Sequence, residues 1–146
     1  SPVWANYLSN IKDLARFSLN GKRILLALGS RMINEAVLSV RESGGIPFAR
    51  VLPTPAGLRA ALGADLPKDS LAVIKPFQGD SSSIEIALCK RWSINSVICR
   101  QSGGITQYMW ERICLETKMD LWLISRPKLQ TGLIVFNTLD DLVKNI

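Results

Sequence analysis

Hydrophobic residues in this chain fall into short continuous runs that alternate with longer segments of helical period. Residues 24–28 form one such run, and Gly29 ends it. In the segment that follows, residues 32–43, apolar side chains recur three and four positions apart, at Ile33, Ala36, Val37 and Val40. A run bounded by turn residues is typical of a buried parallel strand, whereas the second spacing is typical of an amphipathic helix. The pattern predicts repeated strand–helix units.

The same alternation continues along the rest of the chain. Further strands are predicted at residues 47–52, 71–74, 96–99, 121–124 and 133–136. Helices are predicted at residues 11–18, 32–43, 56–62, 84–92 and 107–117, with a last helix capped by Thr138. The residues before Ile11 are expected to form an irregular arm. We therefore predict an α/β fold in a single domain, residues 1–146, with a Rossmann-like open, mainly parallel sheet of about five strands flanked by helices.

The chain is basic, with 18 Lys and Arg against 12 Asp and Glu and a net charge of +6. In an open parallel sheet, ligands bind outside the carboxyl ends of the strands. Five predicted strand ends each carry a cation there, namely Arg31, Arg50, Lys75, Arg100 and Arg126. These cations predict a shared rim that binds a polyanionic ligand; the alternative is that they are solvated surface charges.

Two turns that contain glycine follow predicted strands and belong to the same rim. Their residues are Gly29 and Ser30 in one, and Ser102, Gly103 and Gly104 in the other. Glycine lets the backbone approach a ligand closely, and the helix after each turn offers free N–H groups to phosphate or carboxylate. Neither turn matches Gly-x-Gly-x-x-Gly or a P-loop, so each is also consistent with simple packing geometry.

The absence of histidine excludes imidazole chemistry and His-ligated zinc. The three cysteines, Cys89, Cys99 and Cys114, form no Cys-x-x-Cys pair and are predicted to be buried hydrophobes in a reducing compartment, with no metal site. No apolar run is long enough for a bilayer. The expected location is therefore the cytoplasm, without membrane association.

Carboxylates are scarce around the predicted rim. Asp80 is the only one near a strand end, and its place before a helix is more typical of a cap than of a general acid. Cations, hydroxyls and glycines suit the orientation of a reactive cofactor and a charged substrate, as in hydride transfer, rather than hydrolysis. No residue can be assigned a catalytic role from this pattern.

Five segments together resemble the C-terminal half of the precorrin-6A reductase and cobalt-precorrin-6A reductase family of cobalamin biosynthesis. They are Leu28-Gly29-Ser30-Arg31, Ala49-Arg50-Val51-Leu52-Pro53-Thr54-Pro55, Lys75-Pro76-Phe77, Gln101-Ser102-Gly103-Gly104 and Ser125-Arg126-Pro127. Residues 1–4 and 138–146 are also similar to segments of that family. The resemblance implies two Rossmann-like lobes, with NADPH and the polycarboxylate tetrapyrrole precorrin-6A in the cleft between them. It also implies reduction of one double bond of the macrocycle, giving precorrin-6B.

The chain departs from the family's usual pattern at two positions, with Lys75 in place of a glycine and Trp110 in place of a lysine. The resemblance also implies an N-terminal lobe of the same protein as a partner, and without that lobe we expect no catalysis. A second hypothesis is a non-catalytic tetrapyrrole- or nucleotide-binding module. A nucleic-acid partner is disfavoured, because the cations are spread one per strand end rather than gathered with aromatic residues on one face.

Overall fold

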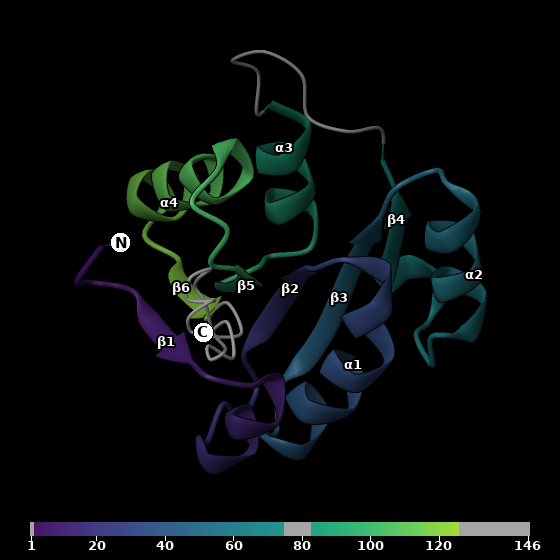
Figure 1. Ribbon diagram of the computed structural model, residues 1–146, viewed down its shortest axis with the longest axis horizontal. Coiled ribbons are helices and arrows are strands. Elements are labelled where there is room, and N and C mark those ends of the chain that lie inside the picture. The colour runs from purple at the N-terminus through teal and green to yellow at the C-terminus, as the bar shows by residue number, and fades with distance from the viewer. Residues whose placement is uncertain (1, 75–82, 126–146) are drawn as a thin grey trace, which may run out of the picture.

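A parallel β-sheet forms the centre of the molecule, as the computed structural model of residues 2–74 and 83–125 shows (Figure 1). Within these residues the sheet has six strands in the order β1-β6-β5-β2-β3-β4, and every neighbouring pair is parallel. The strands are β1 Asn6–Leu8, β2 Arg23–Ala27, β3 Ile46–Val51, β4 Leu71–Val73, β5 Ser96–Arg100 and β6 Asp120–Ile124. The predicted α/β, Rossmann-like fold is confirmed.

Helices cover both faces of this sheet. The α-helices are α1 Ile33–Glu42, α2 Pro55–Gly63, α3 Ser83–Arg91 and α4 Ile105–Thr117, and the 3-10 helices are η1 Ile11–Arg16, η2 Ser30–Met32 and η3 Lys68–Ser70. Side chains of α1 and η1 share one buried cluster with Ile24 and Leu26 of β2, while α3 and α4 share the other with Leu25 and Ala27. Successive residues of a strand point to opposite faces of the sheet. A strand that is covered by helices on both faces is therefore apolar along most of its length.

The segment before η1 differs from the predicted irregular arm. It contains β1, which pairs with β6 at one edge of the sheet, with Asn6 opposite Trp122. The prediction was wrong because a three-residue edge strand has no hydrophobic run of its own and depends on a partner far away in the sequence. The predicted helix over residues 11–18 is also shorter and is a 3-10 helix, in which the buried Ile11 and Leu14 stand one turn apart.

The remaining predicted elements are present with bounds shifted by one or two residues. Gly44 ends α1 with a φ of +88°, and Pro55 opens α2 after the cap residue Thr54, as the glycine and proline signals predict. The predicted strand at 133–136 and the helix capped by Thr138 lie outside the described residues. Among the helices in residues 2–74 and 83–125, none has the length and apolar content needed to cross a membrane.

Candidate functional site

The order of the strands in the sheet changes direction between the neighbouring strands β2 and β5. From β2 it runs through α1 to β3 on one side, and from β5 through α4 to β6 on the other. Because α1 and α4 cover opposite faces, the connections after β2 and β5 diverge at the carboxyl ends of these strands. Such a switch point is where open α/β sheets bind ligands.

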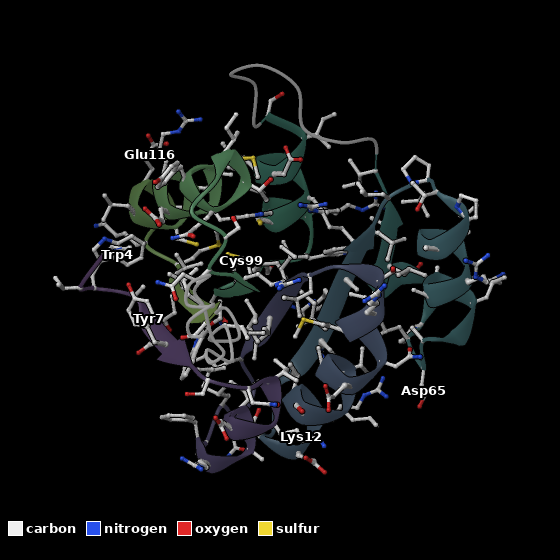
Figure 2. All side chains as sticks on the ribbon, in the orientation of Figure 1. Trp4, Tyr7, Lys12, Asp65, Cys99 and Glu116 are labelled. Carbon is white, nitrogen blue, oxygen red and sulfur yellow. The ribbon has the colours of Figure 1, made fainter. Side chains whose placement is uncertain are left out.

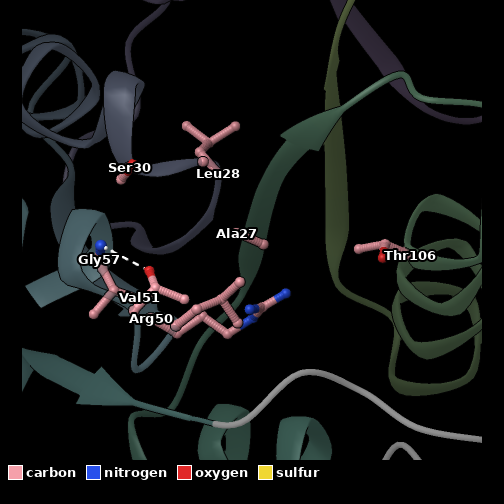
Figure 3. Close-up of a pocket in the computed structure, with 10 residues that line it drawn as sticks. Ala27, Leu28, Ser30, Arg50, Val51, Gly57 and Thr106 are labelled. Atoms are coloured by element: carbon pink, nitrogen blue, oxygen red, sulfur yellow. Dashed lines mark hydrogen bonds between the residues drawn. The ribbon is translucent and has the colours of Figure 1, made fainter.

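A cavity of about 310 Å³ lies at this end of the sheet (Figure 3). Its walls come from the end of β2 and the turn after it, the end of β3, the start of α2 and the start of α4. The lining residues are Ala27, Leu28, Gly29, Ser30, Arg50, Val51, Leu52, Thr54, Gly57 and Thr106. The volume is at the lower end of the range for small-molecule sites, so the cavity can take one part of a large ligand. We call it the switch-point pocket.

The wall beside β3 depends on a close approach of α2. Thr54 caps the helix, its Oγ1 accepting a hydrogen bond of 3.0 Å from the backbone N–H of Gly57. A Cβ atom on Gly57 would overlap the backbone carbonyl of Leu52, so only glycine allows this packing. The sequence therefore fixes the position of α2, and with it one side of the pocket.

Arg50 supplies the positive charge of the switch-point pocket. It stands on the side of the sheet that α3 and α4 cover, two positions after Phe48. The register that pairs Leu26 with Ala49 places Ala27 beside Arg50. Figure 3 shows the Arg50 side chain extending past this small residue in the direction of Thr106.

The Arg50 guanidinium is partly buried and incompletely paired. Its Cζ lies 5.9 Å from the ring centroid of Trp110, within the range of a cation–π contact. Burial lowers the pKa of Arg50 below its usual value, and the carboxylate of Glu85 opposes that shift. The group stays charged, since arginine is not deprotonated in proteins. Its Nε is buried and has no hydrogen-bond partner among the described residues. Arg50 also lines the pocket, and a guanidinium there is suited to a phosphate or carboxylate oxygen.

In the turn before α4, the backbone N–H groups donate to nearby side chains, one in the turn and one on α4 itself. Gly103 N–H donates to Gln107 Oε1 at 2.7 Å, and Gly104 N–H donates to Ser102 Oγ at 3.2 Å. The φ of Gly103 is +70°, a left-handed conformation that favours glycine. In this arrangement the two amides help to begin α4, and the first turn of that helix brings Thr106 to the pocket.

The structure gathers some of the predicted rim residues and separates others. Gly29, Ser30 and Arg50 line the switch-point pocket. The exposed Arg31 and Arg100 are not among its lining residues, nor are Ser102, Gly103 and Gly104. Lys75 and Arg126, and also Asp80, lie outside the described residues. Whether any of the rim residues contacts a ligand stays a prediction.

Other pocket residues carried no recognisable signal in the sequence. Ala27 lies within an apolar run, and Thr106 lies at the start of α4, which begins at Ile105 rather than at the predicted residue 107. Thr54 before Pro55 is a helix-start signature, and a glycine three residues further on is unusual within a helix. That combination could have indicated the close contact between α2 and the end of β3.

The three cysteines are free and buried, as predicted. Burial raises the pKa of Cys89 and of Cys99 to about 12, and it raises the pKa of Cys114 as well. Near neutral pH these thiols are protonated and unreactive. Figure 2 shows Cys99 in the interior of the molecule, among the other side chains.

Three comparisons connect the chain to known proteins. The profile of the family described as Precorrin-6x reductase CbiJ/CobK matches residues 3–146. A cobalt-precorrin-6A reductase from Synechocystis sp. is 30% identical over 125 residues, which are 85% of this chain and 45% of that protein. A solved structure titled CobK precorrin-6A reductase superposes with a TM-score of 0.64 at 14% identity, covering 98% of this chain and 55% of that one. The structural likeness supports the fold alone, and the chain spans about half the length of these relatives.

Proposed function

The chain belongs to the precorrin-6x reductase CbiJ/CobK family, and we propose that it is the C-terminal lobe of an NADPH-dependent precorrin-6A reductase of cobalamin biosynthesis. The whole enzyme would reduce one double bond of the precorrin-6A macrocycle to give precorrin-6B. The observation that carries this proposal is Arg50, a cation that lines a pocket at the switch point of the sheet and forms no ion pair with the other described residues.

The residues of the switch-point pocket fit an anionic group of the cofactor or of the substrate. The Arg50 guanidinium would hold the anion, while Ser30 and Thr106 contribute hydroxyl groups and Gly29 leaves the backbone of its turn open. When bound, NADPH supplies the hydride. The described residues would bind and orient the ligand, and we assign none of them a step in bond making. Arg31, Lys75, Arg100, Ser102, Gly103, Gly104 and Arg126 remain proposed as the outer part of the rim.

The two-lobed arrangement is part of the same proposal. The matched regions cover 45% and 55% of the two relatives, which leaves about half of each for a second lobe. A pocket of about 310 Å³ holds only part of a dinucleotide or of a tetrapyrrole. In our proposal the N-terminal lobe holds the remainder, so that catalysis requires both.

The test is NADPH oxidation in the presence of precorrin-6A by the full-length protein that contains this chain. Arg50→Met should lower kcat/KM by tenfold or more, because a charge-assisted hydrogen bond to the ligand is lost. Arg112→Met, an exposed position on α4 outside the rim, is the matched control and should leave kcat/KM within twofold of the wild type. Full activity of a folded Arg50→Met enzyme would contradict the proposal.

The outer rim is tested by Arg31→Ala and Arg100→Ala. If these side chains contact phosphate or carboxylate groups, each substitution should weaken ligand binding by about 1 kcal/mol or more. Unchanged affinity would mean that both are solvated surface charges. The alternative function, a binding module without turnover, predicts tight binding of NADPH or of a tetrapyrrole to the full-length protein and no oxidation of NADPH.

A further inference from the structure

Helix α3 buries a carboxylate on the side of the sheet that it covers. Glu85 on α3 is only 3% exposed, although its neighbour Ile84 is 59% exposed. It stands one helical turn before Cys89, whose side chain belongs to the apolar cluster on the α3 and α4 side of the sheet. Placing a carboxylate in apolar surroundings is unfavourable unless a positive charge compensates it. At this position α3 therefore directs a charged side chain into the interior and an apolar side chain towards solvent.

The compensating charge is Arg50. It follows Phe48 by two positions and therefore stands on the side of the sheet that α3 covers, and the charge of Glu85 opposes the lowering of the Arg50 pKa. The four ion pairs found among the described residues, all within 4.0 Å, do not include Glu85 and Arg50. Glu85 therefore balances the charge of Arg50 from a greater distance and does not occupy its Nε. The guanidinium remains available on the pocket side.

We propose that Glu85 sets the affinity of the switch-point pocket for anions, acting as the counter-charge of Arg50 when no ligand is bound. The carboxylate stabilises the empty site by offsetting a partly buried guanidinium. It also repels an incoming phosphate or carboxylate and so weakens binding. This inference rests on the anion-binding role proposed above for Arg50. Glu85 is a positioning residue that acts through Arg50 and touches no ligand.

The contact between Arg50 and Trp110 supports separate roles for the protein interior and for the ligand. The Trp110 ring faces the guanidinium, is fully buried and does not line the pocket. Trp110 and Glu85 together hold the arginine from the protein interior, one through the π-face and one through charge. Among the described residues no oxygen atom pairs with the Arg50 Nε, and in our proposal the anion binds the guanidinium from the pocket that Arg50 lines.

The experiment measures anion binding to the full-length protein that contains this chain by calorimetry, with NADPH, inorganic pyrophosphate and citrate as separate probes. Glu85→Gln keeps the side-chain volume and removes the charge. It should bind these anions about three- to tenfold more tightly than the wild type and unfold at a lower urea concentration. A residue with only a structural role would weaken binding or leave it unchanged. Glu85→Asp retains the charge and is expected to stay within about twofold of the wild-type affinity.

Two further variants keep the inference testable. Should Glu85→Gln fail to fold, Glu85→Met removes the charge without burying an amide and is expected to show the same tightening. Adding Glu85→Gln to Arg50→Met should have no further effect on anion affinity, since Glu85 acts through the arginine. An equal or weaker affinity of the folded, charge-free variants would overturn the inference.

The two proposals fail in distinguishable ways. If NADPH does not bind but pyrophosphate or citrate binds and Glu85→Gln tightens it, the reductase proposal is contradicted and the role of Glu85 stands. If the wild type binds NADPH and Glu85→Gln does not bind it more tightly, only the role of Glu85 is contradicted. If no probe binds to the wild type or to the charge-free variants, both are overturned. A preference for pyrophosphate over citrate identifies phosphate as the favoured group.

Discussion

Arg23 and Arg50 occupy opposite ends of the same side of the sheet, and each is partly buried over an aromatic ring. Arg23 opens β2; its Nε donates to the backbone oxygen of Trp92 at 2.6 Å, and its Cζ lies 4.6 Å from the centroid of Phe48. Arg50 stands near the carboxyl end of β3, with Cζ at 5.9 Å from the ring centroid of Trp110 and a buried Nε that has no hydrogen-bond partner in the part of the chain that the structure describes. Both residues are arginines in contact with an aromatic ring. They differ in that the Nε of Arg23 has a hydrogen-bond acceptor, whereas the Nε of Arg50 has none among the described residues.

This contrast separates a structural cation from a candidate binding cation. Arg23 joins β2 to the residue that follows α3, so its hydrogen bond closes the amino end of the sheet. Within residues 2–74 and 83–125, Arg50 forms no ion pair and is compensated by Glu85 from a greater distance, so its Nε is left without an acceptor in that part of the chain. Because buried polar groups are nearly always paired in folded proteins, the exception is the more informative of the two.

The largest effect on stability is expected from Arg23→Met. It removes a charged hydrogen bond and a cation–π contact and leaves a carbonyl group unpaired, so the free energy of unfolding should fall by about 3 kcal/mol. Anion affinity should not change. The matched variant at the other end is Arg50→Met with Glu85→Leu, which removes both charges and should leave stability unchanged or raise it. Urea denaturation measures both, and equal losses in the two variants would remove the distinction between the two arginines.

Glycine substitutions sharpen the same comparison. At the amino end, Gly44→Ala would force a Cβ atom against Asn20 at a positive φ; at the carboxyl end, Gly57→Ala would force one against the Leu52 carbonyl. Each should cost about 2 kcal/mol of unfolding free energy. Only Gly57→Ala should also weaken anion binding, because it moves a wall of the pocket. Gly63→Ala, with ordinary contacts on the same helix, is the control. Weaker binding in Gly44→Ala would show that the two ends are coupled.

The smallest effect is expected at the cap of α2. Thr54→Ala removes the acceptor for Gly57 N–H and should lower the free energy of unfolding by about 1 kcal/mol. Thr54→Ser retains the hydroxyl group and should restore most of that loss. Thermal or urea unfolding measures the difference. If alanine and serine were equivalent, the cap would not contribute to the wall of the pocket.

The central strands could be predicted from the sequence because both of their faces are buried. The apolar runs in β2, β5 and β6 leave little choice of structure, and the alternation with helices implies parallel pairing. β1 could not be found in this way, since two of its three residues are exposed and its pairing comes from β6. Hydrophobic pattern therefore indicates the middle of this sheet and not its edge.

The candidate site could be predicted only in part, for a related reason. Position after a strand identified Gly29, Ser30 and Arg50. It does not say which face a side chain takes, so Arg31 and Arg100 were grouped with them although they do not line the pocket. Glu85 was missed because hydrophobic pattern assigns a carboxylate beside an isoleucine to the surface, whereas the structure buries the carboxylate and exposes the isoleucine. That inversion is visible only in three dimensions.

The pairing of β1 with β6 has a consequence for the order in which the sheet is assembled. Among the six strands described here, β1 comes first in the sequence, yet the residue opposite Asn6 is Trp122, close to the end of the described residues. Loop-closure entropy makes such distant contacts slow to form, whereas β2 and β3 are joined through a single helix. During translation, β1 therefore waits without its partner until residues 122–124 have emerged from the ribosome. The edge of the sheet is completed only after the centre can fold.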